Sequence, residues 1–418
     1  MRALTDLTRD LVSTASHEDE SRAGDLIETW LAEHTDADVT RDGAANVIAR
    51  RTLGDAVPDA ESRSLAFVGH HDVVPPDDSQ LAGDSNEDAD RTGEYAVEER
   101  DGRLYGRGTA DMKGAVAAAM CAFRDAASNA SKNDDDSNTS RSAEQTDADV
   151  DSTGGETPSV DELVFASFVG EEVGGVGARH AIDAGFAPGY AIVGEGSTSY
   201  SNPNTTDVAV AHKGRRASTI TARGDAAHAS EPEAGENAVY RACDAVDVVR
   251  GIDAPAVEIA GEELRGSVVV TEIEGGSAWN VIPDSCTLTI DERTVPGERA
   301  PLGDVGETAG VSWDVDQDLP PMRCESDAFA ETVRGAAAAA QETPPELVTK
   351  PHATDAGWLA EADTACVICG PAEPGEAHTE TESVSIEVLN RCYRIYRGTA
   401  EAMCCSMSVQ HIASAAPR

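Results

Sequence analysis

The sequence lacks the features of membrane, secreted and nucleic-acid-binding proteins. It contains no run of eighteen or more apolar residues, which excludes a membrane-spanning helix, and its first residues form no apolar signal-peptide core. Lysine is scarce, and the net charge is -45. A field of this sign repels nucleic acids and anionic membranes, so we expect neither as a partner. The sequence therefore predicts a cytoplasmic protein.

The excess of acid is spread over the whole chain rather than confined to one tail. Asp and Glu together number 77 against 32 Lys and Arg, and both halves of the sequence contribute. Salt screens such charges and makes a large net charge tolerable. We interpret this as a halophile-type surface, adapted to a salty cytoplasm.

The cysteines show no disulfide framework. There are nine of them, an odd number without regular spacing, which fits a reducing compartment. Cys366 and Cys369 form a CxxC pattern, but they lie in the apolar run 364–369. Buried strand cysteines are therefore a better interpretation than a metal or redox site.

Apolar runs that alternate with helical patterns predict an α/β fold. A chain of 418 residues is too long for one ordinary core and indicates two domains. Several apolar runs end in glycine, as buried parallel strands often do. We expect a mixed, mostly parallel-core sheet flanked by helices. The predicted strands are 46–50, 65–68, 163–169 and 190–193, and the predicted helices are 16–34 and 111–127.

The pattern changes between residues 214 and 320, which we predict to be an inserted domain. Strands with period-two alternation and an intervening helix follow one another in β-α-β-β-α-β order. This order predicts an α+β ferredoxin-like domain over 214–320, inserted into a larger domain formed by 1–213 and 321–418. The predicted elements are strands 217–223, 267–273, 286–292 and 311–315 and helix 236–249.

Three segments carry too few large apolar side chains to join a core. Residues 77–94 and 128–160 are rich in Asp and Ser, so we expect acidic, disordered insertions there. In the tail, we expect a disordered extension from Cys404 onward.

Acidic and imidazole side chains follow the predicted strands, where ligand sites of open α/β sheets lie. Gathering so many carboxylates in one buried place requires a compensating cation. Imidazole and carboxylate groups suit zinc, with cobalt or manganese as alternatives. The residues are His70, Asp72, Asp111, Glu171, Glu172, Glu195 and His378.

A series of motifs gives the chain a family resemblance that covers nearly its whole length in order. The motifs are GHHDVVP (69–75), GRGTADMKG (106–114), GEEVGG (170–175), VGEGS (193–197), HKGRRAS (212–218) and AHTETE (377–382). The chain resembles the co-catalytic di-zinc metallopeptidase and deacylase family. That family includes acetylornithine deacetylase, succinyl-diaminopimelate desuccinylase, carboxypeptidase G and aminoacylase, and the desuccinylase is the most similar.

The resemblance implies a zinc-exopeptidase-like catalytic domain over 1–213 and 321–418 and a lid or dimerisation domain over 214–320. It also implies a centre that binds two divalent metal ions, zinc first among the candidates. His70 and Glu195 would bind one ion, and Glu172 and His378 would bind the other. Asp111 would bridge the two ions through its two oxygens. The implied reaction is hydrolysis of a linear amide bond.

Three further residues receive catalytic roles from the same resemblance. Asp72 would orient the centre, and Glu171 would be the general base that takes a proton from water. His228, in the inserted domain, would donate a hydrogen bond to the oxyanion. In the family this histidine often reaches the partner subunit's site, so we expect a homodimer.

The resemblance also implies residues that bind an anionic substrate. Arg293 and Asn280 would hold the α-carboxylate of the amino acid. Arg215 and Ser218, in a Gly-Arg-Arg-x-Ser pattern, would suit a second carboxylate such as that of a succinyl group. The sequence therefore predicts hydrolysis of a small N-acyl amino acid, with N-succinyl-LL-2,6-diaminopimelate as the first candidate and a place in lysine biosynthesis.

Other functions remain open at this point. The chain could be an acetylornithine deacetylase-like enzyme, another N-acyl-amino-acid deacylase, or a dipeptidase or carboxypeptidase. A non-catalytic amino-acid binding protein on the same fold is an alternative of a different class. That alternative predicts loss of Glu171 or of metal ligands, and every one of them is present.

Overall fold

The chain forms two compact units in a computed structural model that describes residues 2–53, 63–82, 94–126 and 157–414. The first unit comprises Met1–Val210, Cys324–Val348 and Ala362–Arg418. The second comprises Ala211–Arg323 and Thr349–Glu361. The structure thus groups Thr349–Glu361 with the second unit, whereas the sequence analysis left it in the first.

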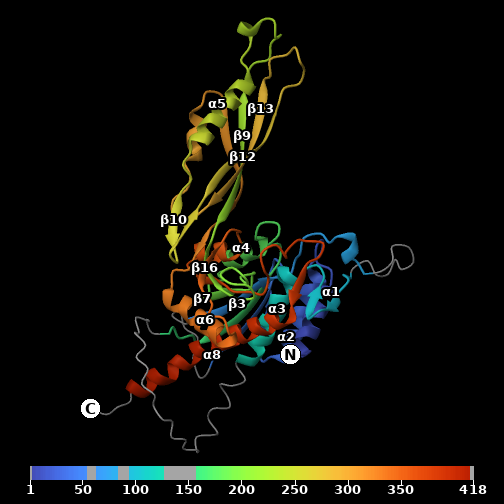
Figure 1. The fold of residues 1–418 in the computed structure, drawn as a ribbon, viewed down its shortest axis with the longest axis vertical. Coiled ribbons are helices and arrows are strands. Elements are labelled where there is room, and N and C mark those ends of the chain that lie inside the picture. Colours follow the sequence, from blue (N-terminus) through green and yellow to red (C-terminus); the bar gives the residue numbers. More distant parts are fainter. Residues whose placement is uncertain (1, 54–62, 83–93, 127–156, 415–418) are drawn as a thin grey trace, which may run out of the picture. The chain divides into compact units, whose positions relative to one another are not determined.

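A mixed sheet with the strand order β1-β2-β6-β3-β7-β17-β8 forms the centre of the first unit (Figure 1). The neighbours β6, β3, β7 and β17 run parallel, whereas β1, β2 and β8 pair antiparallel. This confirms the predicted mixed sheet with a parallel core. The strands are β1 (Asp38–Arg41), β2 (Val47–Thr52), β3 (Ser64–His70), β6 (Glu162–Phe168), β7 (Tyr190–Val193), β8 (Val208–His212) and β17 (Ala365–Ile368).

Helices cover this sheet and account for the burial of its strands. Every residue of β3 is buried, as expected for a parallel strand covered on both faces. The alanine-rich helix α3 (Gly114–Ala126) is buried around most of its circumference and packs against α8 (Ile386–Ser414). The other helices are α1 (Arg2–Ser13), α2 (Ser21–His34), α4 (Val176–Asp183), α6 (Asp327–Ala340) and α7 (Ala356–Glu361).

Shorter strands complete the assignment. A small antiparallel sheet has the order β18-β5-β4. Its members are β4 (Glu98–Arg100), β5 (Arg103–Tyr105) and β18 (Ser383–Ser385), and the remaining short strands are β15 (Met322–Arg323) and β16 (Leu347–Lys350). The β5–β18 pairing ties a segment near residue 105 to one near residue 384.

The predicted helix over 16–34 is wrong in its first turn. The structure instead has α1 before it and begins α2 at Ser21. Ser16 is buried and its backbone N–H donates to the hydroxyl of Tyr95, so it does not cap a helix. The polar stretch 16–20 lacks the apolar positions that helix packing requires.

The three segments predicted to be disordered differ in outcome. In 77–94, the short 3-10 helix η1 (Asp78–Gln80) is ordered and Gln80 is buried, while 83–93 lies outside the described residues. Most of 128–160 also lies outside them. The prediction for the tail is wrong, because α8 continues through Cys404 to Ser414.

The second unit has the predicted ferredoxin-like topology. Its antiparallel sheet has the order β12-β13-β9-β14, and α5 (Ala238–Gly251) packs on one face of that sheet (Figure 1). The second predicted helix is only a 3-10 segment, η4 (Leu302–Glu307). The strands are β9 (Gly214–Arg223), β12 (Ser267–Gly275), β13 (Ser285–Thr294) and β14 (Val311–Leu319), with an additional hairpin of β10 (Ala256–Ile259) and β11 (Glu262–Arg265).

The CxxC cysteines are structural. Cys366 lies in β17, Cys369 follows it, and both are completely buried and unbridged. Burial raises the pKa of both thiols well above the usual value, which disfavours the thiolate. The predicted buried strand cysteines are confirmed.

Candidate metal centre

Three parallel strands deliver side chains to one edge of the first unit's sheet. His70 is the last residue of β3 and Asp72 follows it. Glu172 comes after β6, and Glu195 comes after β7. Because β6, β3 and β7 are parallel neighbours, their carboxyl ends meet at the same edge. The strand pattern read from the sequence thus places these side chains together.

Asp111 reaches the same place from an irregular turn before α3. Gly106 and Gly108 have φ angles of 149° and 85°, which side chains other than glycine rarely adopt. Asp111 itself is non-helical, with φ -129° and ψ 96°. Because the helix begins only at Gly114, the turn before it can direct the Asp111 carboxylate toward His70.

The two nitrogens of His70 have different partners. Nδ1 lies 3.0 Å from the backbone oxygen of Asp72 and 3.3 Å from its Oδ1. Nε2 lies 3.2 Å from Oδ1 of Asp111 and 3.4 Å from Oε1 of Glu195. A proton on Nδ1, held by Asp72, leaves the lone pair of Nε2 for a metal ion.

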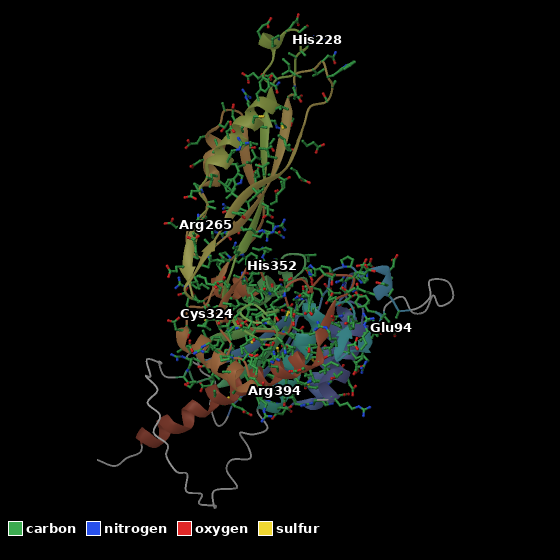
Figure 2. The ribbon with its side chains drawn as sticks, viewed as in Figure 1. Glu94, His228, Arg265, Cys324, His352 and Arg394 are labelled. Carbon is green, nitrogen blue, oxygen red and sulfur yellow. The ribbon has the colours of Figure 1, made fainter. Side chains whose placement is uncertain are left out.

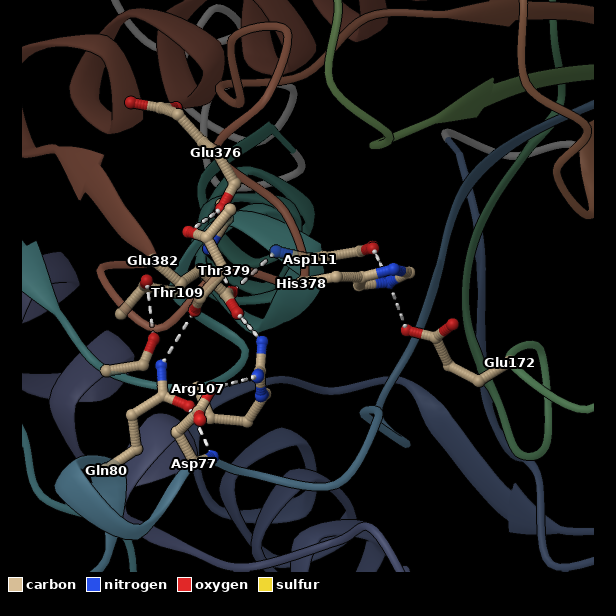
Figure 3. Close-up of polar contacts among 12 residues, drawn as sticks. Asp77, Gln80, Arg107, Thr109, Asp111, Glu172, Glu376, His378, Thr379 and Glu382 are labelled. Carbon is tan, nitrogen blue, oxygen red and sulfur yellow. Dashed lines mark hydrogen bonds and ion pairs between the residues drawn. The ribbon is translucent and has the colours of Figure 1, made fainter.

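His378 makes the matching set of contacts from the loop before β18. Its Nε2 lies 2.9 Å from Oδ2 of Asp111 and 3.0 Å from Oε1 of Glu172 (Figure 3). Asp111 therefore presents one oxygen to His70 and the other to His378. This is the arrangement expected of a carboxylate shared by two cations.

The carboxylates control the protonation of both histidines. Hydrogen bonds to Asp111 and Glu172 raise the pKa of His378 to about 10. Burial lowers the pKa of His70, but hydrogen bonds to Asp111 and Asp72 outweigh burial and raise it well above the usual value. Burial likewise raises the pKa of Asp111, yet the two histidines hold it well below its usual range. A metal cation would compete for the same lone pairs as these protons.

The donor set fits a divalent cation. Ligand atoms of His70, Asp111 and Glu172 lie within 4.8 Å of one another. Two ligands of a tetrahedral ion with bonds of about 2.0–2.1 Å are themselves about 3.3 Å apart. The separations from His70 Nε2 to Asp111 and Glu195, 3.2 and 3.4 Å, agree with that value.

Other predicted residues lie in the second unit, around two neighbouring loops. The backbone of His228 forms an isolated bridge with Val281, and the N–H of Ala229 donates to the oxygen of Asn280. His228 and Asn280 are both exposed, and Figure 2 shows His228 in the loop that follows β9. The structure thus brings these two predicted residues into adjacent segments.

The predicted clamp of Arg215 with Ser218 needs correction. Ser218 is completely buried on the face of β9 that packs against α5, whereas Arg215 lies on the opposite face. Arg215 instead lies opposite Arg293 of β13, and the Nε atoms of both donate to Asp291 at 2.8 Å. Arg215 and Arg293 therefore share one face of the sheet, and Ser218 lies on the other.

Sequence reasoning missed a buried carboxylate beneath the Asp111 turn. Glu382 accepts hydrogen bonds from the backbone N–H groups of Ala110 and Asp111 and pairs with Arg107 (Figure 3). Its place four residues after His378, in the last predicted motif, was the available signal. Because the chain is so rich in acidic residues, the sequence alone gives no reason to single out Glu382 without knowledge of its contacts.

Comparison with known proteins finds matches to one family. Residues 66–135 match the model described as Peptidase family M20/M25/M40, and residues 210–301 match the Peptidase dimerisation domain. A curated relative, acetylornithine deacetylase from Myxococcus xanthus, is 28% identical over 361 residues, which cover 82% of this chain and 80% of the relative. By these matches, the chain is similar to the M20 peptidase family in both of its units.

Solved structures of M20 proteins share the fold of this chain. Aminopeptidase PepT from Bacillus cereus is 18% identical, with a TM-score of 0.70 and coverage of 96% of this chain and 98% of that one. A protein from Bacillus subtilis, described as a dinuclear metal binding peptidase of the M20 family, is 14% identical with a TM-score of 0.64. The match covers 95% of this chain and 96% of the Bacillus subtilis chain. At these identities the likeness concerns the fold alone.

The likeness to this family confirms several predictions. The chain is a metallohydrolase of amide bonds, it carries a candidate metal site, and it contains a dimerisation domain. Among the described residues, no helix combines the length and apolar character that crossing a bilayer requires.

Proposed function

We propose that this protein is a two-metal hydrolase that removes the acyl group from an N-acyl amino acid. The observation that carries the two-metal part is the position of Asp111, whose Oδ1 and Oδ2 face His70 and His378 at 3.2 and 2.9 Å. A carboxylate shared in this way suits two cations about 3.5–4 Å apart. The likeness to acetylornithine deacetylase supports the substrate class.

The contacts divide the ligands into two sets that share Asp111. His70 and Glu195 would hold one ion, and Glu172 and His378 would hold the other. The nitrogen and carboxylate donors suit zinc first, with cobalt or manganese as alternatives. Two such ions would polarise the scissile carbonyl and lower the pKa of the attacking water.

Two acids next to this centre take different roles in the proposal. Asp72 contacts Nδ1 of His70 with one oxygen and accepts from the backbone N–H of Glu172 with the other, at 3.0 Å. It therefore orients ligands from both β3 and β6. Glu171 is partly exposed beside Glu172, and we assign it the transfer of a proton from water to the leaving amine.

His228 supplies a donor for the oxyanion in this proposal. The backbone N–H of Ser230 donates to Nδ1 of His228 at 3.2 Å. An Nδ1 that accepts a hydrogen bond places the proton of a neutral imidazole on Nε2, which can then donate. Because His228 is exposed within one chain and the chain has a dimerisation domain, we propose that it serves the partner subunit's centre in a homodimer.

Arg215 and Arg293 are the proposed site for the substrate carboxylate in the second unit. The predicted pairing of Arg293 with Asn280 is wrong, because Asn280 precedes the first residue of β13 whereas Arg293 lies at the other end of that strand, opposite Arg215. The two guanidinium groups share the single carboxylate of Asp291, which leaves the trio with one net positive charge. A planar guanidinium binds carboxylate through paired hydrogen bonds. In a chain of net charge -45, this local excess is what an anionic substrate requires.

The acyl group has two candidates, each with its own observation. The curated relative favours acetyl, as in acetylornithine. The Arg215 pattern favours the additional carboxylate of a succinyl group, although Ser218, the other half of that pattern, is buried on the opposite face. We therefore place acetyl first and N-succinyl-diaminopimelate second.

A hydrolysis assay tests the proposal. Purified protein in molar KCl, loaded with zinc or cobalt, is given Nα-acetylornithine, N-succinyl-diaminopimelate and simple dipeptides. We expect release of acetate or succinate that Glu171→Gln abolishes and that the exposed, matched control Glu331→Gln on α6 retains. Cleavage of dipeptides alone would replace the deacylase assignment by a peptidase. Absence of hydrolysis in a protein with two bound metals would favour a binding role.

A further inference from the structure

Glu382 is a completely buried carboxylate that serves the backbone of a proposed metal ligand. Its Oε1 accepts from the N–H groups of Ala110 and Asp111 at 3.0 and 3.2 Å. Its Oε2 lies 2.6 Å from Nη1 of Arg107, whose side chain is 3% exposed. These bonds use both carboxylate oxygens and fix the peptide groups on either side of Ala110 (Figure 3).

The energetics of such a pair make it a strict constraint. Charge-assisted hydrogen bonds are about twice as strong as neutral ones, and a buried charge that loses its partner is strongly destabilising. Arg107 and Glu382 therefore hold each other in one geometry. Glu382 accepts from the backbone N–H groups of Ala110 and Asp111, so this geometry fixes the backbone position from which the Asp111 side chain extends.

A second tie holds the segment that carries His378. The side-chain amide of Gln80 donates to the backbone oxygen of Thr379 at 3.1 Å, and its oxygen accepts from the N–H of Asp77 at 3.0 Å. Thr379 directly follows His378, and the N–H of Glu382 donates to the oxygen of Thr379 at 3.2 Å. Gln80 is buried, so this tie is shielded from water.

Together the two ties connect two of the three ligands of one proposed metal ion, Asp111 and His378. Glu382 lies on the His378 segment and holds the Asp111 turn, while Gln80 holds the residue after His378. We propose that Glu382, assisted by Arg107 and Gln80, is a positioning residue that sets the separation of Asp111 and His378. This inference rests on the proposed two-metal function.

The inference predicts an asymmetric effect on the two metal sites. Asp111 and His378, which would hold the ion shared with Glu172, both depend on these ties. The other ion would share Asp111, but its own two ligands, His70 and Glu195, come from the ends of β3 and β7 and not from the tied segments. Disturbing Glu382 should therefore weaken binding at the His378 site more than at the His70 site.

Stepwise metal binding of full-length Glu382→Gln tests this. Glutamine keeps the size but has one acceptor oxygen, so its NH₂ group must face either Arg107 or the Ala110 and Asp111 N–H groups. We measure the two zinc or cobalt dissociation constants by calorimetric titration in molar KCl, without substrate. We expect one of the two constants to rise about 10- to 100-fold and the other to change much less.

A matched control separates positioning from general destabilisation. Glu292 in the second unit is also buried, pairs with Arg216 at 2.5 Å and accepts from the N–H of Ala300. Glu292→Gln should lower the unfolding temperature to a similar degree but leave both metal constants unchanged. If Glu382→Gln does not fold, Gln80→Ala, which removes only neutral hydrogen bonds, takes its place with a smaller loss in the same constant.

Two results would overturn the inference. One is a variant at Glu382, or at Gln80 in its place, that binds two ions with wild-type constants. The other is an equal loss in Glu292→Gln, because the effect would then follow stability. Failure of the wild-type chain to bind two ions would instead contradict the proposed function, so the two failures are distinguishable.

Discussion

Asp72 accepts a hydrogen bond from the backbone N–H of Glu172 across 3.0 Å. Through its other oxygen, 3.3 Å from Nδ1 of His70, the same carboxylate fixes which imidazole nitrogen faces the centre. One buried side chain thus couples the end of β3 to the turn after β6. The centre is therefore organised by contacts that lie behind its proposed ligands.

Asp72→Asn should weaken metal binding without unfolding the chain. The amide oxygen can still accept from the Glu172 N–H, but the NH₂ group then donates to Nδ1 of His70 and moves the imidazole proton to Nε2. We expect about 10- to 100-fold weaker metal affinity, measured by titration. Asp183→Asn, on the exposed end of α4, is the control and should bind metal like the wild type.

Glu171→Gln and Glu172→Gln should separate proton transfer from metal binding. Loss of a general base typically lowers kcat by about 10²- to 10⁴-fold. We expect that loss in Glu171→Gln with two metals retained, whereas Glu172→Gln should lose one metal. Steady-state kinetics and metal analysis on the same preparations distinguish the two. A Glu171→Gln enzyme with wild-type kcat would remove that residue from the mechanism.

Mixing two inactive variants tests whether His228 acts across the dimer. If His228 serves the partner subunit, a heterodimer of Glu171→Gln and His228→Ala has one centre with both groups intact. We expect co-refolded mixtures to regain activity that neither parent shows. If His228 acts on its own subunit, every centre in the mixture lacks one group and activity stays absent.

The acidic surface predicts a strong dependence of stability on salt. At low ionic strength the Debye length grows from about 8 Å at 0.15 M to 30 Å at 0.01 M, so repulsion among the excess acids is no longer screened. We expect the thermal unfolding temperature to fall steadily as KCl is diluted. A chain that stays folded and fully active at low salt would refute the halophile-type interpretation.

The sequence predicted the parts of the centre that have a local signal. Each of the strands β3, β6 and β7 is an apolar run followed by a polar ligand, and parallel pairing places such ends together. The alternation of side chains along a β-strand also predicts that Arg215 and Ser218 cannot form a clamp on one face. Residues 215 and 218 are three positions apart, an odd number, and so lie on opposite faces of a strand.

Long-range contacts are what the sequence could not supply. Glu382 and Arg107 are separated by 275 residues, and Gln80 and Thr379 by 299. No local pattern distinguishes Glu382 from the other acids of this chain. The missed helix α1 is different, because its Leu4, Leu7 and Leu11 do follow helical spacing and were available to inspection.

The bridging position of Asp111 is the central claim, and anomalous diffraction from crystals grown with zinc tests it most directly. The account predicts two anomalous peaks about 3.5–4 Å apart, one near each oxygen of Asp111, with His70 next to one and His378 next to the other. A single peak, or two peaks that Asp111 does not bridge, would contradict it.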